Sequence, residues 1–216
     1  MERDALETTL ILVRHGETQW NAEDRVQGQQ DCPLNDRGCE QARRVSERLA
    51  GLRVDAVYSS DSGRARQTAE VVAAPHKLPV TLRPALRERS YGELEGKTLE
   101  EAAGDWVDAW RADPQRRRPP GGETQPEMAR RVMAELRRIT AAHAGGTVII
   151  VTHGGPIKSA VYEVLGAPVT RWRRAFVSNG SITTLRGAPG MLRLVTFNDT
   201  CHLNAAAGAA ADEGES

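Results

Sequence analysis

Two short runs of branched aliphatic residues constrain the fold of this chain more than any other feature of its sequence. They lie at residues 10–13 (LILV) and 148–151 (VIIV). A continuous apolar run of this length, with no polar residue at alternate positions, is typical of a strand that is buried on both faces. We therefore expect both runs to form central strands of a parallel sheet with helices packed on each side.

Weaker strand signals accompany these two runs, and helical patterns fill the intervals between strands. The weaker strands are expected at residues 55–58, 80–82, 181–185 and 192–197, and the last two flank a Gly- and Pro-containing turn that favours a hairpin. Amphipathic helices are expected at about residues 36–52, 62–74, 123–143 and 156–165. Strands that alternate with helices predict an α/β fold, here a three-layer α/β/α sandwich with a mostly parallel central sheet.

Three of the expected helices have recognisable starts. Asn35 can cap the helix that follows it, and Ser60 or Asp61 can cap the next one, because their side-chain oxygens can accept from free backbone amides. Pro156 suits the first position of the last helix, where its missing N–H costs nothing.

The chain has the length of one domain with a short tail. We expect one folded domain over residues 1–204 and a mobile acidic tail over residues 205–216, which hold no apolar side chain larger than Ala. Residues 90–122 are less regular and include Arg116, Arg117 and Arg118 followed by Pro and Gly, so we expect a loop there rather than a core element.

Charge and cysteine content disfavour several classes of function. Lys and Arg total 29 and Asp and Glu total 29, so the formal net charge is zero, which disfavours binding to nucleic acid or to an anionic membrane. No apolar run approaches the about 18 residues of a membrane span, and the N-terminus lacks a secretory signal pattern. Three cysteines without a CxxC pair predict reduced thiols. We expect a cytoplasmic monomer or homodimer with no nucleic-acid or membrane partner.

The two most hydrophobic predicted strands are each followed by a histidine and a glycine. The first is followed by Arg14, His15 and Gly16, and the second by Thr152, His153 and a glycine. Ligands of open α/β sheets bind beyond the carboxyl ends of the strands. If the two strands are neighbours, the two histidines face each other over one crevice, and a shared functional site is a better explanation than two satisfied core histidines.

A third strand end adds positive charge to this crevice. Arg64 falls in the first turn of the helix that follows residues 55–58, where free backbone amides and the helix dipole already favour an anion. The guanidinium groups of Arg14 and Arg64 are planar donors that match phosphate oxygens. Two arginines and two histidines around one point predict a phosphate site.

The segment around the first histidine, residues 12–21, reads LVRHGETQWN. It resembles the signature of the histidine phosphatase superfamily, the phosphoglycerate mutase-like proteins with an RHG motif. Further blocks match in the family's order at residues 27–28, 34–38, 59–61, 64–69, 86–88, 92–96, 121–123 and 151–155. The similarity covers about residues 8–200, and ordered blocks are far more specific than one tripeptide.

The resemblance implies covalent catalysis at His15. That side chain would attack phosphorus and carry the phosphoryl group as phosphohistidine, for which it must be neutral. Arg14, Arg64, His153 and Asn21 would stabilise the charge on the transferred group. The amide of Gly154 could add one more donor. The resemblance implies no metal ion and no cofactor, and residues 1–204 would form the catalytic domain.

Glu88 matches the family's general acid, which would protonate the leaving alkoxide and then activate water. Gln27, Gly28 and Tyr91 are implied to bind substrate. The expected substrate is a small phosphorylated metabolite, with sugar phosphates, phosphoserine, phosphoglycerate derivatives, α-ribazole phosphate and nucleotides all open.

The leading interpretation is a metal-independent phosphomonoesterase, and the closest alternative is a phosphoglycerate mutase that uses a bisphosphate primer. Mutases typically carry a longer insertion after the Glu88 block, whereas only about 30 residues lie between Gly92 and Glu123 here, and a shorter lid admits water. A binding protein on the same fold is disfavoured because no catalytic position is lost. For Arg116, Arg117 and Arg118 we expect a solvated loop rather than a nucleic-acid patch, and contact with an anionic substrate tail is the alternative.

Overall fold

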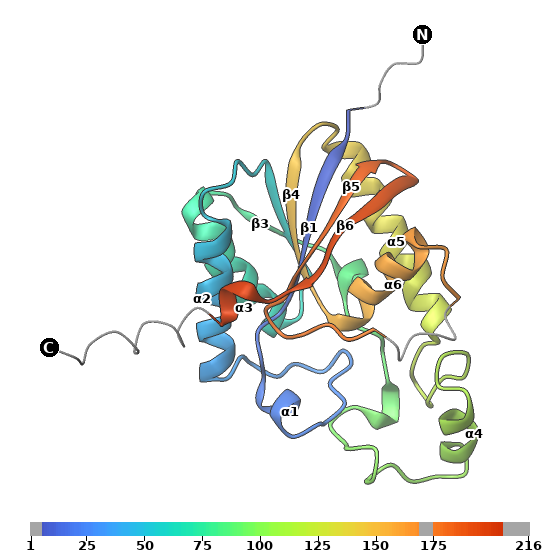
Figure 1. Ribbon diagram of the computed structural model, residues 1–216. Coiled ribbons are helices and arrows are strands. Elements are labelled where there is room, and N and C mark those ends of the chain that lie inside the picture. Colours follow the sequence, from blue (N-terminus) through green and yellow to red (C-terminus); the bar gives the residue numbers. More distant parts are fainter. Residues whose placement is uncertain (1–5, 169–174, 205–216) are drawn as a thin grey trace, which may run out of the picture.

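A computed structural model describes residues 6–168 and 175–204, and its centre is one six-stranded sheet (Figure 1). The strand order is β3-β2-β4-β1-β5-β6. The first four strands in that order run parallel, and the last two form an antiparallel hairpin at one edge. The strands are β1 Thr8–Arg14, β2 Ala56–Ser59, β3 Val80–Leu82, β4 Thr147–Thr152, β5 Ile182–Ala188 and β6 Met191–Asp199.

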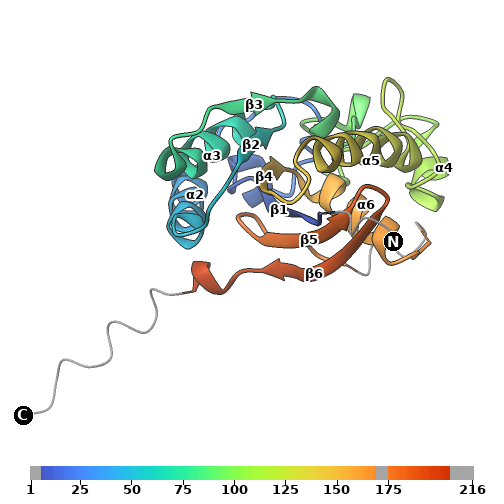
Figure 2. The same cartoon turned by 90° about the horizontal axis from the view of Figure 1, so that it is seen from above.

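Helices cover both faces of the sheet, as Figure 2 shows from above. On one side α2 and α3 pack against Ile11 and Val13, and on the other α5 and α6 pack against Leu10 and Leu12. The alternation of β1 side chains between two apolar cores is what a doubly covered strand requires. The helices are α1 Gln19–Ala22, α2 Asp36–Leu49, α3 Gly63–Ala73, α4 Val107–Ala112, α5 Gln125–Ala142 and α6 Gly154–Val164. The predicted three-layer sandwich with a mostly parallel sheet is confirmed.

The helix starts agree with the sequence in one case and differ in two. Asn35 caps α2, because its Oδ1 accepts from the backbone N–H of Gly38 at 2.8 Å. The N-cap of α3 is Ser62, without a side-chain bond, and Asp31 accepts from the first helical amide instead. Helix α6 begins at Gly154, so Pro156 occupies the third helical position, where its missing N–H is still one of the unpaired amides of the first turn.

The segment predicted as a loop at residues 90–122 is partly helical, which corrects that expectation. It contains α4, whose Val107 and Trp110 are 5% and 6% exposed. Helix α4 has only six residues, too few for a helical period to emerge from the sequence. Arg116, Arg117 and Arg118 are exposed in the loop after it, as expected.

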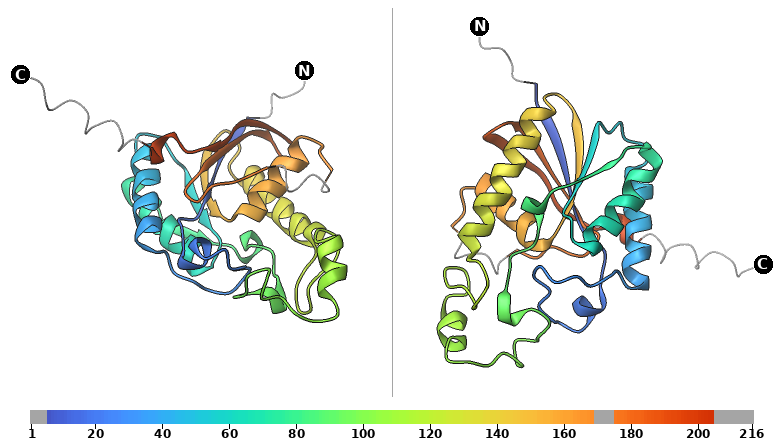
Figure 3. Two further views of the ribbon diagram at one scale, coloured as in Figure 1. Left: turned by 60° about the horizontal axis from the view of Figure 1, so that its bottom comes forward. Right: turned by 180° about the vertical axis from the view of Figure 1, so that it is seen from behind.

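The parallel strands end at one side of the sheet, and the segments that carry α1 and α4 lie beyond those ends (Figures 1 and 3). The register places Arg14 of β1 opposite Thr152 of β4, and Ser59 of β2 opposite Val151. The residues that follow β1, β4 and β2 therefore meet at one place. None of the helices in the described ranges is both long and apolar enough to cross a membrane. The tail at residues 205–216 lies outside the described residues.

Candidate active site

The two strand-end histidines are in contact. The ring centroids of His15 and His153 lie 5.1 Å apart with an interplanar angle of 64°. Both side chains are buried, with exposed fractions of 3% and 0%. Adjacent parallel strands in register deliver them to the same point, as the sequence predicted.

The hydrogen bonds of His15 fix which of its nitrogens can react. Nδ1 lies 2.7 Å from the carbonyl oxygen of Gly16, and because a carbonyl only accepts, Nδ1 carries the proton. Nε2 then holds the lone pair, and it accepts a bond from Nε of Arg64 at 3.3 Å. Burial, and then the positive charges of Arg64 and Arg14, hold the pKa of His15 well below its ordinary value. The imidazole is therefore neutral and nucleophilic at Nε2.

His153 is oriented from the other side of the site. Its Nε2 lies 2.9 Å from Oγ of Ser60, which follows β2. Its Nδ1 is buried and has no hydrogen-bond partner among the described residues. Burial lowers its pKa well below the usual value, and the positive charges of Arg64 and Arg14 lower it further. An unpaired buried ring nitrogen beside the nucleophile is a position for a ligand.

Two guanidinium groups flank the histidines, that of the fully buried Arg64 and that of the half-buried Arg14. Arg14 Nη1 donates to the carbonyl of Val177 at 2.5 Å, while its Nε is buried and unpaired within the described residues. Burial lowers the pKa of Arg14 to about 10, so the side chain stays charged at neutral pH. Arg64 donates to the carbonyls of Gln30 and Gly28 at 2.8 and 2.7 Å. These carbonyl bonds hold Arg64 Nε against the nucleophile.

The carboxyl group of Glu88 lies at the first turn of α6. Its Oε2 accepts from the backbone N–H of Gly155 at 2.9 Å, and its Oε1 accepts from the N–H of Arg89 at 2.8 Å. A Cβ atom at Gly155 would overlap Oε1 of Glu88, so glycine is required for this approach. Helix α6 thus presents the free first-turn amide of Gly155 to the Glu88 carboxylate.

Four of the five predicted substrate-binding residues line one cavity of about 590 Å³ together with His15, Arg14, Arg64 and Glu88; the four are Asn21, Gln27, Gly28 and Tyr91. Asn21 accepts at Oδ1 from Thr18 and Asn179, and its Nδ2 has no recorded partner within the described chain. Gln27 and Gly28 contribute one wall. Gly154 is not part of the lining, but it lies beside the Arg14 guanidinium.

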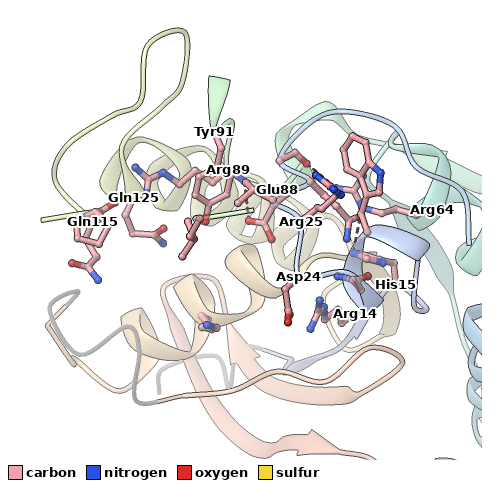
Figure 4. A pocket seen from close by; sticks show the side chains of 18 of the residues that line it. Arg14, His15, Asp24, Arg25, Arg64, Glu88, Arg89, Tyr91, Gln115 and Gln125 are labelled. Atoms are coloured by element: carbon pink, nitrogen blue, oxygen red, sulfur yellow. Dashed lines mark hydrogen bonds between the residues drawn. The ribbon is translucent and has the colours of Figure 1, made fainter. Parts of the chain in front are cut away.

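Figure 4 shows where the side chains lie along the cavity. His15, Arg14 and Arg64 gather at one end, Gln115 and Gln125 lie at the other, and Glu88 stands between them. Tyr91 also lines the cavity. The guanidinium carbon of Arg89 lies over the Tyr91 ring, 5.0 Å from the ring centroid. Burial, and then the charge of Glu88, raises the pKa of Tyr91, so its hydroxyl stays protonated.

Several residues of the site were not singled out by the sequence. Asn179 donates to the carbonyl of His15 at 3.1 Å and to Asn21 Oδ1 at 3.1 Å. It therefore connects the segment that follows β1 to a residue near the start of β5, far along the chain. Lys158 and Trp110 line the cavity. Arg116, Arg117 and Arg118 do not line it. Only Lys158 had a local signal, because it follows the His153 block by about one helical turn.

Within the described residues, no group of three or more His, Cys, Asp or Glu side chains could hold a metal ion. The independence from metal stays a prediction. The arrangement of the described residues offers a neutral nucleophilic nitrogen, two fixed guanidinium groups, an unpaired ring nitrogen and a carboxyl group. These groups match attack on phosphorus with stabilisation of the equatorial oxygens and proton transfer to the leaving group.

Comparisons with known proteins identify the family. A model of the histidine phosphatase superfamily (branch 1) matches residues 10–200. A probable phosphoglycerate mutase, GpmB, from Citrobacter koseri is 38% identical over 207 residues, which cover 92% of this chain and 96% of that protein.

Solved structures show the same fold. YhfR from Bacillus stearothermophilus has a TM-score of 0.85 and 34% sequence identity, covering 91% of this chain and 99% of that one. A phosphoserine phosphatase from Entamoeba histolytica, in complex with phosphoserine, has a TM-score of 0.81 and 30% identity, covering 91% and 99%. Relatives therefore include both phosphoglycerate mutase-like proteins and phosphatases. With the family model spanning nearly all of the described residues, this chain belongs to branch 1 of the histidine phosphatase superfamily.

Proposed function

We propose that this protein is a metal-independent phosphomonoesterase that hydrolyses a small phosphorylated metabolite through a phosphohistidine at His15. The observation that carries the proposal is the state of His15. Its Nδ1 is held by the Gly16 carbonyl at 2.7 Å, and its Nε2 keeps the lone pair, which accepts from Nε of Arg64 at 3.3 Å until a phosphate oxygen takes over that donor. Both arginines line the same cavity as His15. A neutral imidazole in a cationic site is suited to attack on a phosphate ester.

In the first step, the Nε–H of Arg64 turns from Nε2 of His15 to a phosphate oxygen, and the freed lone pair of Nε2 attacks phosphorus. The P–O bond to the leaving group breaks, and the phosphoryl group passes to the imidazole. Arg14 Nε and His153 Nδ1 are buried polar atoms without partners in the described chain, so phosphate oxygens would satisfy both. For the latter bond His153 donates at Nδ1 and accepts from Ser60 at Nε2. Glu88 gives its proton to the departing alkoxide oxygen.

In the second step, Glu88 accepts a proton from water, the resulting hydroxide attacks phosphorus, and His15 leaves as the neutral base. Each carboxylate oxygen of Glu88 accepts one backbone bond and keeps a second lone pair for this proton. The two backbone bonds hold the carboxyl group in one orientation for both steps.

The outer part of the cavity favours hydrolysis over a mutase reaction. A bisphosphate primer places a second phosphate there and needs cations to bind it. Arg25 is already paired with Glu23 and Glu101 at 3.0 and 2.7 Å. Arg89 also lines the cavity, but its guanidinium already donates to the backbone carbonyls of Glu123, Pro114 and Arg117. Lys158 adds a positive charge to the lining, and Asp24 and Glu100 add two negative charges. The aromatic and aliphatic part of the lining is better matched to a leaving group with one apolar face.

The test is phosphate release from a panel of phosphomonoesters beside a phosphoglycerate mutase assay with bisphosphate primer. We expect release from at least one alkyl phosphate and interconversion of phosphoglycerates far slower than hydrolysis. The mutase alternative, which the name of the Citrobacter koseri relative favours, predicts the reverse order of rates. Interconversion well above hydrolysis would overturn the proposal.

A further inference from the structure

Glu88 occupies a part of the backbone that no strand or helix holds. It lies between two single 3-10 turns, Pro84–Leu86 and Gly92–Leu94. A carboxyl group that transfers a proton must stay within hydrogen-bond reach of the leaving oxygen, and a shift of about 1 Å can cost on the order of 10²-fold in rate. Something outside this segment must therefore fix it.

The guanidinium of Arg131, on α5, supplies that support. Its Nη1 donates to the carbonyls of Ala85 and Arg87 at 3.0 and 2.7 Å, and its Nη2 donates to the carbonyl of Glu88 at 2.8 Å. Nε and Nη2 also bind the two carboxylate oxygens of Glu123 at 3.2 and 2.5 Å. All five N–H donors of the side chain are used.

The supporting residues are themselves rigid. Arg131 lies between the buried residues Met128 and Val132 on a helix of 18 residues that packs against the sheet. Glu123 extends the support to Ser90, because its Oε1 also accepts from the backbone N–H of Ser90 at 3.0 Å. The segment from Ala85 to Ser90 is thus held at four backbone groups, three by Arg131 of α5 and one by Glu123, which precedes α5.

We propose that Arg131 is a positioning residue that holds Glu88 in the geometry for proton transfer. This inference rests on the proposed role of Glu88 as the general acid. Lysine cannot replace Arg131, because an ammonium has three donors and no planar fork to span carbonyls and a carboxylate at once. Arg131 does not line the cavity, so it acts through Glu88 and not on the substrate.

The experiment compares Arg131→Met and Arg131→Lys with Arg138→Met as the matched control. Arg138 lies two helical turns further along α5 and pairs only with Glu135 of the same helix within the described chain. The burst of phosphoenzyme formation is measured with an alkyl phosphate and with an activated aryl phosphate. A displaced general acid slows the alkyl ester more, because the aryl leaving group needs little protonation. We expect a burst loss about 10-fold greater for the alkyl ester in both Arg131 variants, and no such difference in Arg138→Met.

A double-mutant cycle with Glu88→Gln separates positioning from a merely structural role. If Arg131 acts through Glu88, Arg131→Lys adds little to the alkyl-ester defect once Glu88 is replaced. Equal losses for the two esters in the Arg131 variants, or full additivity with Glu88→Gln, would overturn the inference. If Arg131→Met does not fold, Arg131→Lys, which keeps the charge, carries the test.

The same data distinguish the two proposals. Leaving-group selectivity in Glu88→Gln but not in the Arg131 variants removes only the role of Arg131. Equal losses for both esters in Glu88→Gln itself remove the general acid, and the inference about Arg131 falls with it.

Discussion

Nε of Arg64 donates to Nε2 of His15 across 3.3 Å, so a permanent positive charge faces the atom that attacks phosphorus. This contact cannot form with an imidazolium, which has no lone pair to accept it. Arg64 therefore selects the neutral form of His15, and its N–H must turn to a phosphate oxygen before Nε2 can attack. Because two backbone carbonyls fix the rest of the guanidinium, the charge is in place before substrate binds.

The buried neutral histidines predict how stability depends on pH. The folded-state pKa of His15 and of His153 is lowered well below 6.5, chiefly by burial. Below about pH 6.5, the ordinary pKa of histidine, the unfolded chain binds protons that the folded chain does not. The free energy of unfolding therefore falls as the pH falls. Each histidine contributes a slope of up to about 1.4 kcal/mol per pH unit.

Urea unfolding between about pH 7.5 and about pH 5.5 measures this slope. We expect His153→Asn to show a shallower slope than the parent protein, with His15 responsible for the remainder. A slope unchanged by His153→Asn would mean that this histidine is protonated in the folded protein.

Gly155→Ala tests the approach of Glu88 to α6. The new Cβ would overlap Oε1 of Glu88, so the carboxyl group must move away from the Gly155 amide that it now accepts from. We expect a loss of on the order of 10²-fold in hydrolysis of alkyl phosphates. Gly51→Ala is the control, because a Cβ there meets no atom within 4 Å. Similar activity in both variants would show that the Glu88 position seen here does not matter for turnover.

Independence from metal predicts that hydrolysis continues in excess chelator. The charge on the phosphoryl group is met by Arg14 and Arg64, whose guanidinium groups line the same cavity end. The measurement is the initial rate with and without EDTA after extended dialysis. Loss of activity with EDTA and recovery with magnesium would instead mean that a metal ion stabilises the charge on the phosphoryl group.

The parts of this structure that follow from local sequence were predictable. The apolar runs of β1 and β4 mark buried strands, and the position of a residue directly after a strand brings His15 and His153 together. Arg64 follows the same rule through the helix that succeeds β2. Each of these inferences needs only a short window and the geometry of parallel strands.

The remainder depends on contacts between distant segments. Asn179 meets His15 across 164 residues, and Arg131 meets Glu88 across 43. Neither residue belongs to a local pattern that signals its partner. Helix α4 was not predicted, because six residues form less than two helical turns. Its Trp110 is buried by tertiary packing and not as part of an amphipathic pattern in the sequence.

The central claim is that His15 carries the phosphoryl group, and acid-sensitive trapping tests it most directly. The enzyme is mixed with a ³²P-labelled phosphomonoester, quenched in alkali within the burst phase, and the labelled peptide is identified by mass spectrometry. We predict a phosphoenzyme that is stable in alkali and labile in acid, with the label on His15, and none in His15→Ala, which should fold normally and not turn over. Steady hydrolysis by His15→Ala, or a label on any other residue, would contradict the account.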